Sequence, residues 1–255
     1  MKNTHIKTAL VTGGSTRIGA AIVKDLADHG FAVAIHANGS LAQASELCAA
    51  IASRGGRACV VQADLCDAGA RAGVIAKAAA ALGPLGLVIN NASIFEDDCI
   101  ESFDEEVFEK HFAVHVKAPA TLIRDFTAQL PEAAHGLVVN MIDQRVWALN
   151  PRFFTYTLSK AALWTATQTL AQALAPRIRV NAIGPGPTLK NHRQSEADFA
   201  AQVDGLILKA GPALAEFGQT IRFLFDTPSI TGQMIALDGG QHLAWQTPDV
   251  AEIKE

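Results

Sequence analysis

The chain has 255 residues and a formal net charge of −4, and 49% of its residues are hydrophobic. A chain of this length can form one large α/β domain or two small ones. No Pro-, Gly- or Ser-rich linker divides it, so we predict a single domain over residues 1–255. The acidic balance argues against nucleic-acid and anionic-membrane partners, because either would require a basic patch.

Neither the cysteines nor the N-terminus points to export or to a membrane. The cysteines form no C-x-x-C pair and have no histidine at ligand spacing, which favours small buried side chains in a reducing cytosol. Residues 1–8 contain no signal-peptide core, and no stretch reaches the roughly 18–20 apolar residues of a membrane span. The acidic runs 96–98 and 104–106 fit solvated helix starts better than a metal site. We therefore expect a cytoplasmic protein without a metal.

Short apolar runs alternate along the chain with longer segments of helical periodicity, which predicts parallel strands joined by crossover helices. The apolar runs, in chain order, are Thr8–Val11, Phe31–His36, Ala58–Gln62, Leu85–Asn90, Gly136–Ile142, Ile178–Ile183 and Met234–Asp238. The clearest helical segments are Ile18–His29, Ser40–Arg54, Glu105–Leu130 and Thr155–Ala175. This order predicts a doubly wound α/β Rossmann fold, with helices on both faces of a parallel sheet.

Residues 12–19, which read Thr-Gly-Gly-Ser-Thr-Arg-Ile-Gly, lie between the first predicted strand and the first predicted helix. In that position glycines let the backbone approach a pyrophosphate, whose charge then faces the N-terminus of the helix. A glycine-rich string alone is a weak signal, but the strand–turn–helix setting makes it a much stronger sign of dinucleotide binding.

The end of the second predicted strand indicates which dinucleotide is bound. An acidic residue normally binds the adenosine ribose of NAD at this point, yet residues 36–40 contain no carboxylate. A carboxylate would repel a 2′-phosphate, so its absence favours NADPH. Arg17 and His36 are the candidate positive charges for that phosphate, and Asn38 and Ser40 are the candidate hydrogen-bond donors.

Tyr156 and Lys160 are four residues apart on a predicted helix and therefore share one face. A phenol with its ordinary pKa of about 10 is a poor acid–base group near neutrality. A lysine ammonium beside it favours the phenolate and lowers the phenol pKa toward the working range. Tyr156 is also the only tyrosine of the chain. The pair is therefore the candidate catalytic machinery.

These motifs together resemble the short-chain dehydrogenase/reductase family over nearly the whole chain. The resemblance rests on the glycine-rich loop, Asn90-Asn91-Ala92, the Y-x-x-x-K pair, Pro185-Gly186 and Asp238-Gly239-Gly240. It implies a single-domain Rossmann fold with a seven-stranded parallel sheet, a homotetramer, and hydride transfer with NAD(P). The cofactor-binding residues expected on this basis are Gly13, Ser15, Arg17, Ile18, Gly19, His36, Asn38, Ser40, Asp64, Leu65, Asn91, Ala92, Ser93, Lys160, Pro185, Gly186 and Thr188.

Three departures from the family pattern point to one branch. Arg17 replaces a glycine of the loop, Ser93-Ile94-Phe95 follows Asn90-Asn91-Ala92 in place of a glycine, and Asp143 stands where a serine is usual. In this the chain resembles the pteridine reductases, and within them the bacterial dihydromonapterin reductases with side activity on dihydrofolate. The resemblance implies NADPH-dependent reduction of a dihydropterin of the dihydromonapterin or dihydrobiopterin type, or of dihydrofolate, to the tetrahydro form.

The chemistry of a pterin fits these departures. An ionised aspartate cannot donate a hydrogen bond to a carbonyl, but Asp143 can accept one from Tyr156 or from a nitrogen-rich ring. Phe95 can stack on a flat pterin, and Arg17 and Ser93 can contact the pterin or the cofactor. The expected substrate-binding residues are therefore Arg17, Ser93, Phe95, Asp143 and Tyr156, of which Asp143 and Tyr156 act in catalysis with Lys160. The alternatives are core packing for Phe95 and helix-start capping for Asp143.

Several alternatives remain at this point. A generic carbonyl reductase acting on 3-oxoacyl or sugar substrates is the runner-up, and a non-catalytic dinucleotide-binding protein is a third reading. His115 either holds a water in a proton relay or packs in the core. Residues 184–210 are expected to form the substrate loop, with a mobile lid at 189–196 that is otherwise an ordinary exposed loop. In that lid Lys190, His192 and Arg193 face either ligand or solvent.

Overall fold

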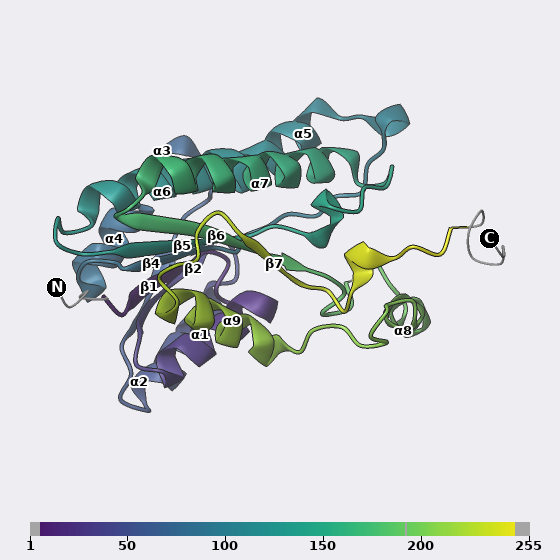
Figure 1. Cartoon of the computed structure of the whole chain (residues 1–255). Helices are drawn as coiled ribbons and strands as arrows, with labels where there is room; N and C mark the ends of the chain where they lie inside the picture. Colours follow the sequence, from purple (N-terminus) through teal and green to yellow (C-terminus); the bar gives the residue numbers. More distant parts are fainter. Residues whose placement is uncertain (1–5, 192, 248–255) are drawn as a thin grey trace.

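The computed structural model describes residues 6–191 and 193–247, so His192 lies outside the described residues (Figure 1). Parallel strands form one sheet in the order β3-β2-β1-β4-β5-β6-β7. Their bounds are β1 (Thr8–Val11), β2 (Ala32–Ala37), β3 (Ala58–Gln62), β4 (Leu87–Asn90), β5 (Gly136–Met141), β6 (Ile178–Pro185) and β7 (Met234–Leu237). The predicted seven-stranded parallel Rossmann sheet is confirmed.

Helices cover both faces of the sheet, as predicted (Figure 1). One face carries α1 (Arg17–Asp28), α2 (Leu41–Ala52) and α9 (Leu214–Asp226); the other carries α3 (Ala68–Ala72), α4 (Val74–Leu82), α5 (Glu105–Phe112), α6 (Ala118–Gln129) and α7 (Phe154–Leu174). Successive residues of a strand point to opposite faces. Val11 therefore packs in the core that contains Ile22 of α1, whereas Leu10 packs in the core that contains Phe126 of α6. Both faces of the sheet are buried, which explains the nearly continuous apolar strands.

The predicted helix Glu105–Leu130 is interrupted. A π-helical turn, η2 (Ala113–Lys117), joins α5 to α6. Pro119 follows it in the first turn of α6 and has no amide hydrogen, so it cannot bond to the carbonyl of His115 four residues earlier. The π-helical turn is wider than an α-helical turn and accommodates the lack of this hydrogen bond. It directs His115 into the core, where the side chain is fully buried.

The two acidic runs behave differently from each other. Asp104 lies at the start of α5, and its carboxylate accepts hydrogen bonds from the amides of Glu106 (2.7 Å) and Val107 (3.1 Å), in line with the prediction. The prediction is wrong for Asp98, which is buried and accepts from the amide of Thr155 at 3.1 Å. Asp98 thus caps α7 from a distant loop, because Phe153 precedes that helix and has no capping oxygen.

Candidate active site

A cavity of about 890 Å³ opens at the carboxyl ends of the central strands, where doubly wound folds bind their ligands. One wall comes from a segment longer than the predicted lid 189–196. We call it the lid segment (residues 186–191 and 193–209), and it contains α8 (Glu196–Asp204). The cavity is lined by many of the predicted site residues, namely Arg17, Ile18, Asn91, Ser93, Phe95, Asp143, Tyr156, Lys160, Pro185, Gly186 and Thr188.

The glycine-rich loop is held in place by the turn after β4. The Thr12 hydroxyl accepts hydrogen bonds from the amides of Asn91 and Ala92, both at 2.9 Å, and the Asn91 side chain donates to the Thr12 carbonyl at 2.8 Å. Gly13 has a φ of +59°, and a Cβ there would lie 3.0 Å from the Ala92 Cα. A Cβ on Gly19 would collide with the Gly13 carbonyl oxygen. The backbone path therefore requires glycine, and it leads into the N-terminus of α1, where amides can receive a pyrophosphate, so the site fits a dinucleotide.

His36 does not act as a cation for the 2′-phosphate, which corrects the prediction. The ring is buried, its Nδ1 accepts from the Gly13 amide at 3.1 Å, and its Nε2 lies 3.1 Å from the Ala63 carbonyl. That carbonyl can only accept, so Nε2 carries the proton and the imidazole is neutral. Burial lowers the pKa of His36. The residue positions the glycine loop and carries no charge to the phosphate.

The remaining predicted cofactor residues do not line the cavity. Asn38 and Ser40 follow β2, and the Ser40 side chain makes no capping bond to α2. Asp64 is exposed after β3 and accepts from the Cys66 amide at 2.8 Å, which shapes the turn that contains buried Leu65. The rest lie in the glycine loop and in the turn that holds it: Gly13, Ser15, Gly19 and Ala92.

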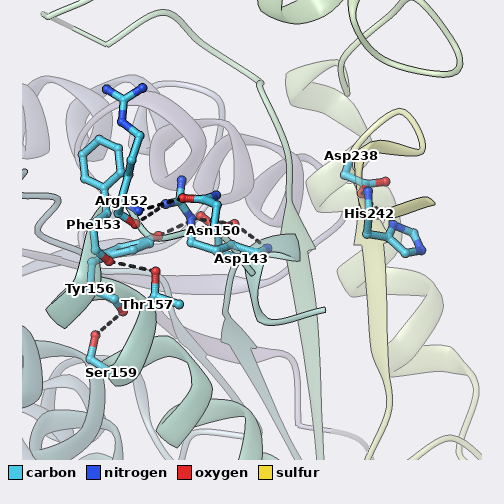
Figure 2. Close-up of polar contacts among 10 residues, drawn as sticks. Asp143, Asn150, Arg152, Phe153, Tyr156, Thr157, Ser159, Asp238 and His242 are labelled. Atoms are coloured by element: carbon cyan, nitrogen blue, oxygen red, sulfur yellow. Dashed lines mark hydrogen bonds and ion pairs between the residues drawn. The ribbon is translucent and has the colours of Figure 1, made fainter. Parts of the chain in front are cut away.

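Asp143 and Tyr156 form a hydrogen-bonded pair in the cavity (Figure 2). The Tyr156 hydroxyl donates to Asp143 Oδ2 at 3.1 Å, while Asp143 Oδ1 accepts from the Arg145 amide at 2.8 Å. Asp143 therefore fills both roles considered for it, since it also caps the 3₁₀ turn η3 (Gln144–Val146). Burial raises the pKa of Asp143, and the Arg145 guanidinium opposes that rise.

The acid–base state of Tyr156 differs from the prediction. Burial and the Asp143 carboxylate raise the pKa of Tyr156 well above 10, so Lys160 does not lower it in this state. Lys160 Nζ donates to the Met141 carbonyl at 2.9 Å and lies 5.6 Å from the Tyr156 ring centroid. Burial lowers the pKa of Lys160 to about 8. A buried lysine beside a buried phenol thus leaves the phenol protonated and ready to donate.

Phe95 projects into the cavity but stacks on another side chain of the protein. Its ring lies 4.2 Å from that of Phe153 with an interplanar angle of 18°, and it meets Tyr156 edge-on at 4.7 Å. The guanidinium groups of Arg193 and Arg145 lie 5.1 Å from the Phe95 centroid and 5.0 Å from the Phe153 centroid, respectively. Phe95 thus belongs to an aromatic and cationic wall of the cavity, and Phe153 occupies one of its faces.

The lid segment is bonded to the body of the protein on two sides. Arg17 donates to the carbonyls of Leu189 (3.0 Å) and Lys190 (3.1 Å), and Arg193 donates to the Phe95 carbonyl at 3.0 Å. Of the predicted lid residues, Arg193 lines the cavity, whereas Lys190 pairs with Glu196 at 2.9 Å. Arg17 thus contacts the lid backbone, a role that its position in the phosphate loop did not indicate.

His115 packs between the loop after β4 and α7. Ser159 donates to the Tyr156 carbonyl at 2.7 Å, so His115 Nδ1 donates to the Ser159 hydroxyl at 2.7 Å, and Nε2 faces Ser93 (2.9 Å) and the Ile94 amide (3.3 Å). Burial, Lys160 and His111 lower the pKa of His115 well below 6.5. Both ring nitrogens bind protein groups, which favours packing over a water relay.

Several cavity residues were not predicted from the sequence. Gln144 and Arg145 follow Asp143 directly, Asn150 and Arg152 precede α7, and Gln194, Asp198, Phe199 and Gln202 come from the lid segment. For Gln144 and Arg145 the signal in the sequence is their place just after a predicted central strand, because residues beyond the carboxyl end of such a strand border the ligand site. The lid residues carry no such signal, because nothing local fixes which way a lid helix faces.

Comparison with known proteins assigns the class. Residues 7–201 match the family model of the short chain dehydrogenases, and the chain belongs to this family. An uncharacterised oxidoreductase of Methylorubrum extorquens is 33% identical, covering 92% of this chain and 97% of its own. A 3-oxoacyl-[acyl-carrier-protein] reductase of Staphylococcus aureus is 30% identical, covering 93% of this chain and 98% of its own.

Two solved structures are more similar still. Both are structures of FolM alternative dihydrofolate reductase 1 in complex with NADP, and both have a TM-score of 0.94. The Brucella suis protein is 58% identical, covering 95% of this chain and 98% of its own; for the Brucella canis protein the values are 57%, 96% and 98%. The predicted family is confirmed, and these neighbours support the predicted pteridine reductase branch. No helix of the described residues has the length and apolar character needed to cross a membrane.

Proposed function

We propose that the protein reduces a dihydropterin, of the dihydromonapterin, dihydrobiopterin or dihydrofolate type, with NADPH. The observation that carries this proposal is the Asp143–Tyr156 pair beside Phe95, where an aspartate replaces the serine of carbonyl reductases. The similarity to two NADP-bound FolM structures supports the same substrate class and cofactor. In the reaction a hydride adds to C6 of the 7,8-dihydropterin and a proton adds to N5, so the C=N double bond becomes a single bond.

The chain offers residues for both halves of the cofactor. NADPH, when bound, supplies the hydride. The amides at the N-terminus of α1 would hold its pyrophosphate, and Lys160, Pro185, Gly186 and Thr188 would hold the nicotinamide half. His36 is neutral and Arg17 binds the lid in this structure. Hydrogen-bond donors such as Asn38 and Ser40 would therefore contribute more to 2′-phosphate binding than the predicted charges.

Proton delivery falls to Tyr156 and Asp143. The raised pKa of Tyr156 keeps the phenol protonated, and the raised pKa of Asp143 lets its carboxyl take up and release a proton more readily. The pair can therefore give a proton to N5 and recover it from water. We propose that water also supplies this proton, so Tyr156→Phe should retain part of the turnover.

A 3-oxoacyl or other carbonyl reductase is the second candidate, favoured by the similarity to the staphylococcal reductase. A carbonyl oxygen requires a hydrogen-bond donor as negative charge develops on it. An ionised Asp143 accepts but does not donate, and would repel that charge. A dihydropterin substrate therefore fits the aspartate at position 143 better than a carbonyl substrate does.

Oxidation of NADPH by the purified protein tests the proposal directly. Dihydromonapterin, dihydrobiopterin and dihydrofolate are assayed in parallel with a panel of small ketones and 3-oxoacyl thioesters. Turnover of pterins without ketone reduction is expected. The matched variant is Asp143→Ser, which restores the donor and should lose pterin activity while gaining ketone activity. Ketone turnover alone by the unaltered protein would overturn the proposal.

We also propose a homotetramer in the cytoplasm, following the family resemblance. Exposed apolar side chains on the described surface, including Phe103, Trp147 and Leu158, support an association of subunits. Light scattering after size-exclusion chromatography measures the assembly, and a monomeric mass would exclude it.

A further inference from the structure

Gln144 is a buried polar residue of the cavity lining whose side-chain oxygen has no hydrogen-bond partner. Only 6% of the residue is exposed, its carboxamide oxygen is buried without a hydrogen bond, and it lines the cavity beside Asp143. A buried acceptor without a partner is destabilising, and such groups are rare in native proteins. The protein therefore keeps an unfavourable group at the position next to its catalytic aspartate.

Arg145 Nε is also buried without a hydrogen bond, but it lies 3.9 Å from the Asp143 carboxylate, which balances its charge. Asp143 is bonded to Tyr156 and to the Arg145 amide, and Gln202 on the lid accepts from Gln194 at 2.8 Å. A ligand that satisfies Gln144 would remove the desolvation penalty and gain affinity. A carboxamide offers one acceptor and one N–H donor side by side, so it matches a ring that presents N–H and C=O on adjacent atoms.

We propose that Gln144 is a specificity-determining residue that binds the N3–H/C4=O edge of the pterin ring. This inference rests on the proposed function. In a pterin, C4=O lies next to N5 on the ring periphery, with N3–H beyond it. If Asp143 and Tyr156 give the proton to N5, Gln144, which follows Asp143 and begins η3, borders the C4 carbonyl. The Gln144 carboxamide nitrogen then donates to that carbonyl, and its oxygen accepts from N3–H.

The test uses the protein with NADPH and dihydromonapterin, comparing Gln144→Leu and Gln144→Glu with the unaltered chain. Because Gln144 contacts the N3–H/C4=O edge and not the C6 and N5 atoms that react, we expect KM for the pterin to rise about tenfold or more while kcat changes little. Gln43→Leu, on the exposed face of α2, makes the same change outside the site and should leave KM unaltered.

Binding of a pteridine with a different hydrogen-bonding edge provides a second test, because misfolding would not change the preference between two ligands. A 2,4-diaminopteridine presents an amino group in place of C4=O, so a carboxylate at position 144 accepts from it. We expect Gln144→Glu to bind this inhibitor more tightly than dihydropterin, relative to the unaltered chain, by calorimetry on the NADP complex. Unchanged KM and unchanged inhibitor preference in both variants, with pterin turnover intact, would overturn the role of Gln144. Absence of pterin turnover in the unaltered chain would instead overturn the proposed function.

Discussion

Asp143 has two structural roles, because one oxygen orients the catalytic phenol and the other fixes the turn that carries the next residues. We expect Asp143→Ala to lower kcat/KM for the dihydropterin by at least tenfold, equivalent to about 1.4 kcal/mol of transition-state stabilisation. Steady-state kinetics measure the loss. Asp143→Asn keeps the cap on Arg145 and should show the catalytic loss without a loss of thermal stability. A decrease of less than tenfold in both variants would assign Asp143 to capping alone.

Lys160 gives the site a measurable pH dependence. Burial lowers its pKa to about 8, so the ammonium loses its proton as the pH rises through that value. A neutral amine attracts the phosphates and the ribose hydroxyls of the cofactor less strongly. We expect kcat/KM for NADPH to decline above about pH 8, and the Lys160→Met variant to show a low profile without this transition. A profile of the unaltered enzyme that stays flat well above pH 8 would contradict the assignment.

Among the elements, the lid segment depends on a residue far from it in sequence. Arg17 has a φ of +51°, which costs a non-glycine residue about 1–2 kcal/mol, yet its guanidinium holds two lid carbonyls. We expect Arg17→Gly to relieve the backbone strain, leave the melting temperature nearly unchanged, and free the lid. Trypsin measures the release, since Lys190 and Arg193 are cleavage sites within it. Unchanged cleavage at these sites would show that Arg17 does not hold the lid.

The elements also show where sequence reasoning reaches its limit. The strands and the glycine loop follow from local pattern, because apolar runs and turn glycines are determined within a few residues. The π-helical turn before Pro119 and the capping of α7 by Asp98 do not, since they depend on a missing bond and on a partner 57 residues away. The charge of a side chain is also hard to predict from the sequence. His36 lies where a cation would help to bind a phosphate, but burial lowers its pKa and keeps it neutral.

Across the whole molecule, three buried histidines link stability to pH. Burial lowers the pKa of His36, His111 and His115, whereas in the unfolded chain each has its ordinary value near 6.5. The unfolded state therefore binds more protons below about pH 6.5, and stability falls as the pH falls. Each histidine contributes up to about 1.4 kcal/mol per pH unit in that window.

We expect urea denaturation to give a clearly smaller free energy of unfolding at about pH 5.5 than at pH 7.5, a range in which most carboxylates remain ionised. The His115→Asn variant should reduce this difference, because one of the three protons is then absent. Equal free energies at the two pH values would show that the histidines are not held neutral by the fold.

The presence of a single tyrosine makes the catalytic phenol visible in the intact protein. No other side chain gives a phenolate band in the near ultraviolet, so a spectroscopic titration of the native chain follows Tyr156 alone. With its pKa raised well above 10, the protein without cofactor should show no phenolate absorbance through neutral and mildly alkaline pH. The positive nicotinamide ring of NADP⁺ favours ionisation of the phenol, so addition of NADP⁺ should move the band to lower pH and report assembly of the site without turnover.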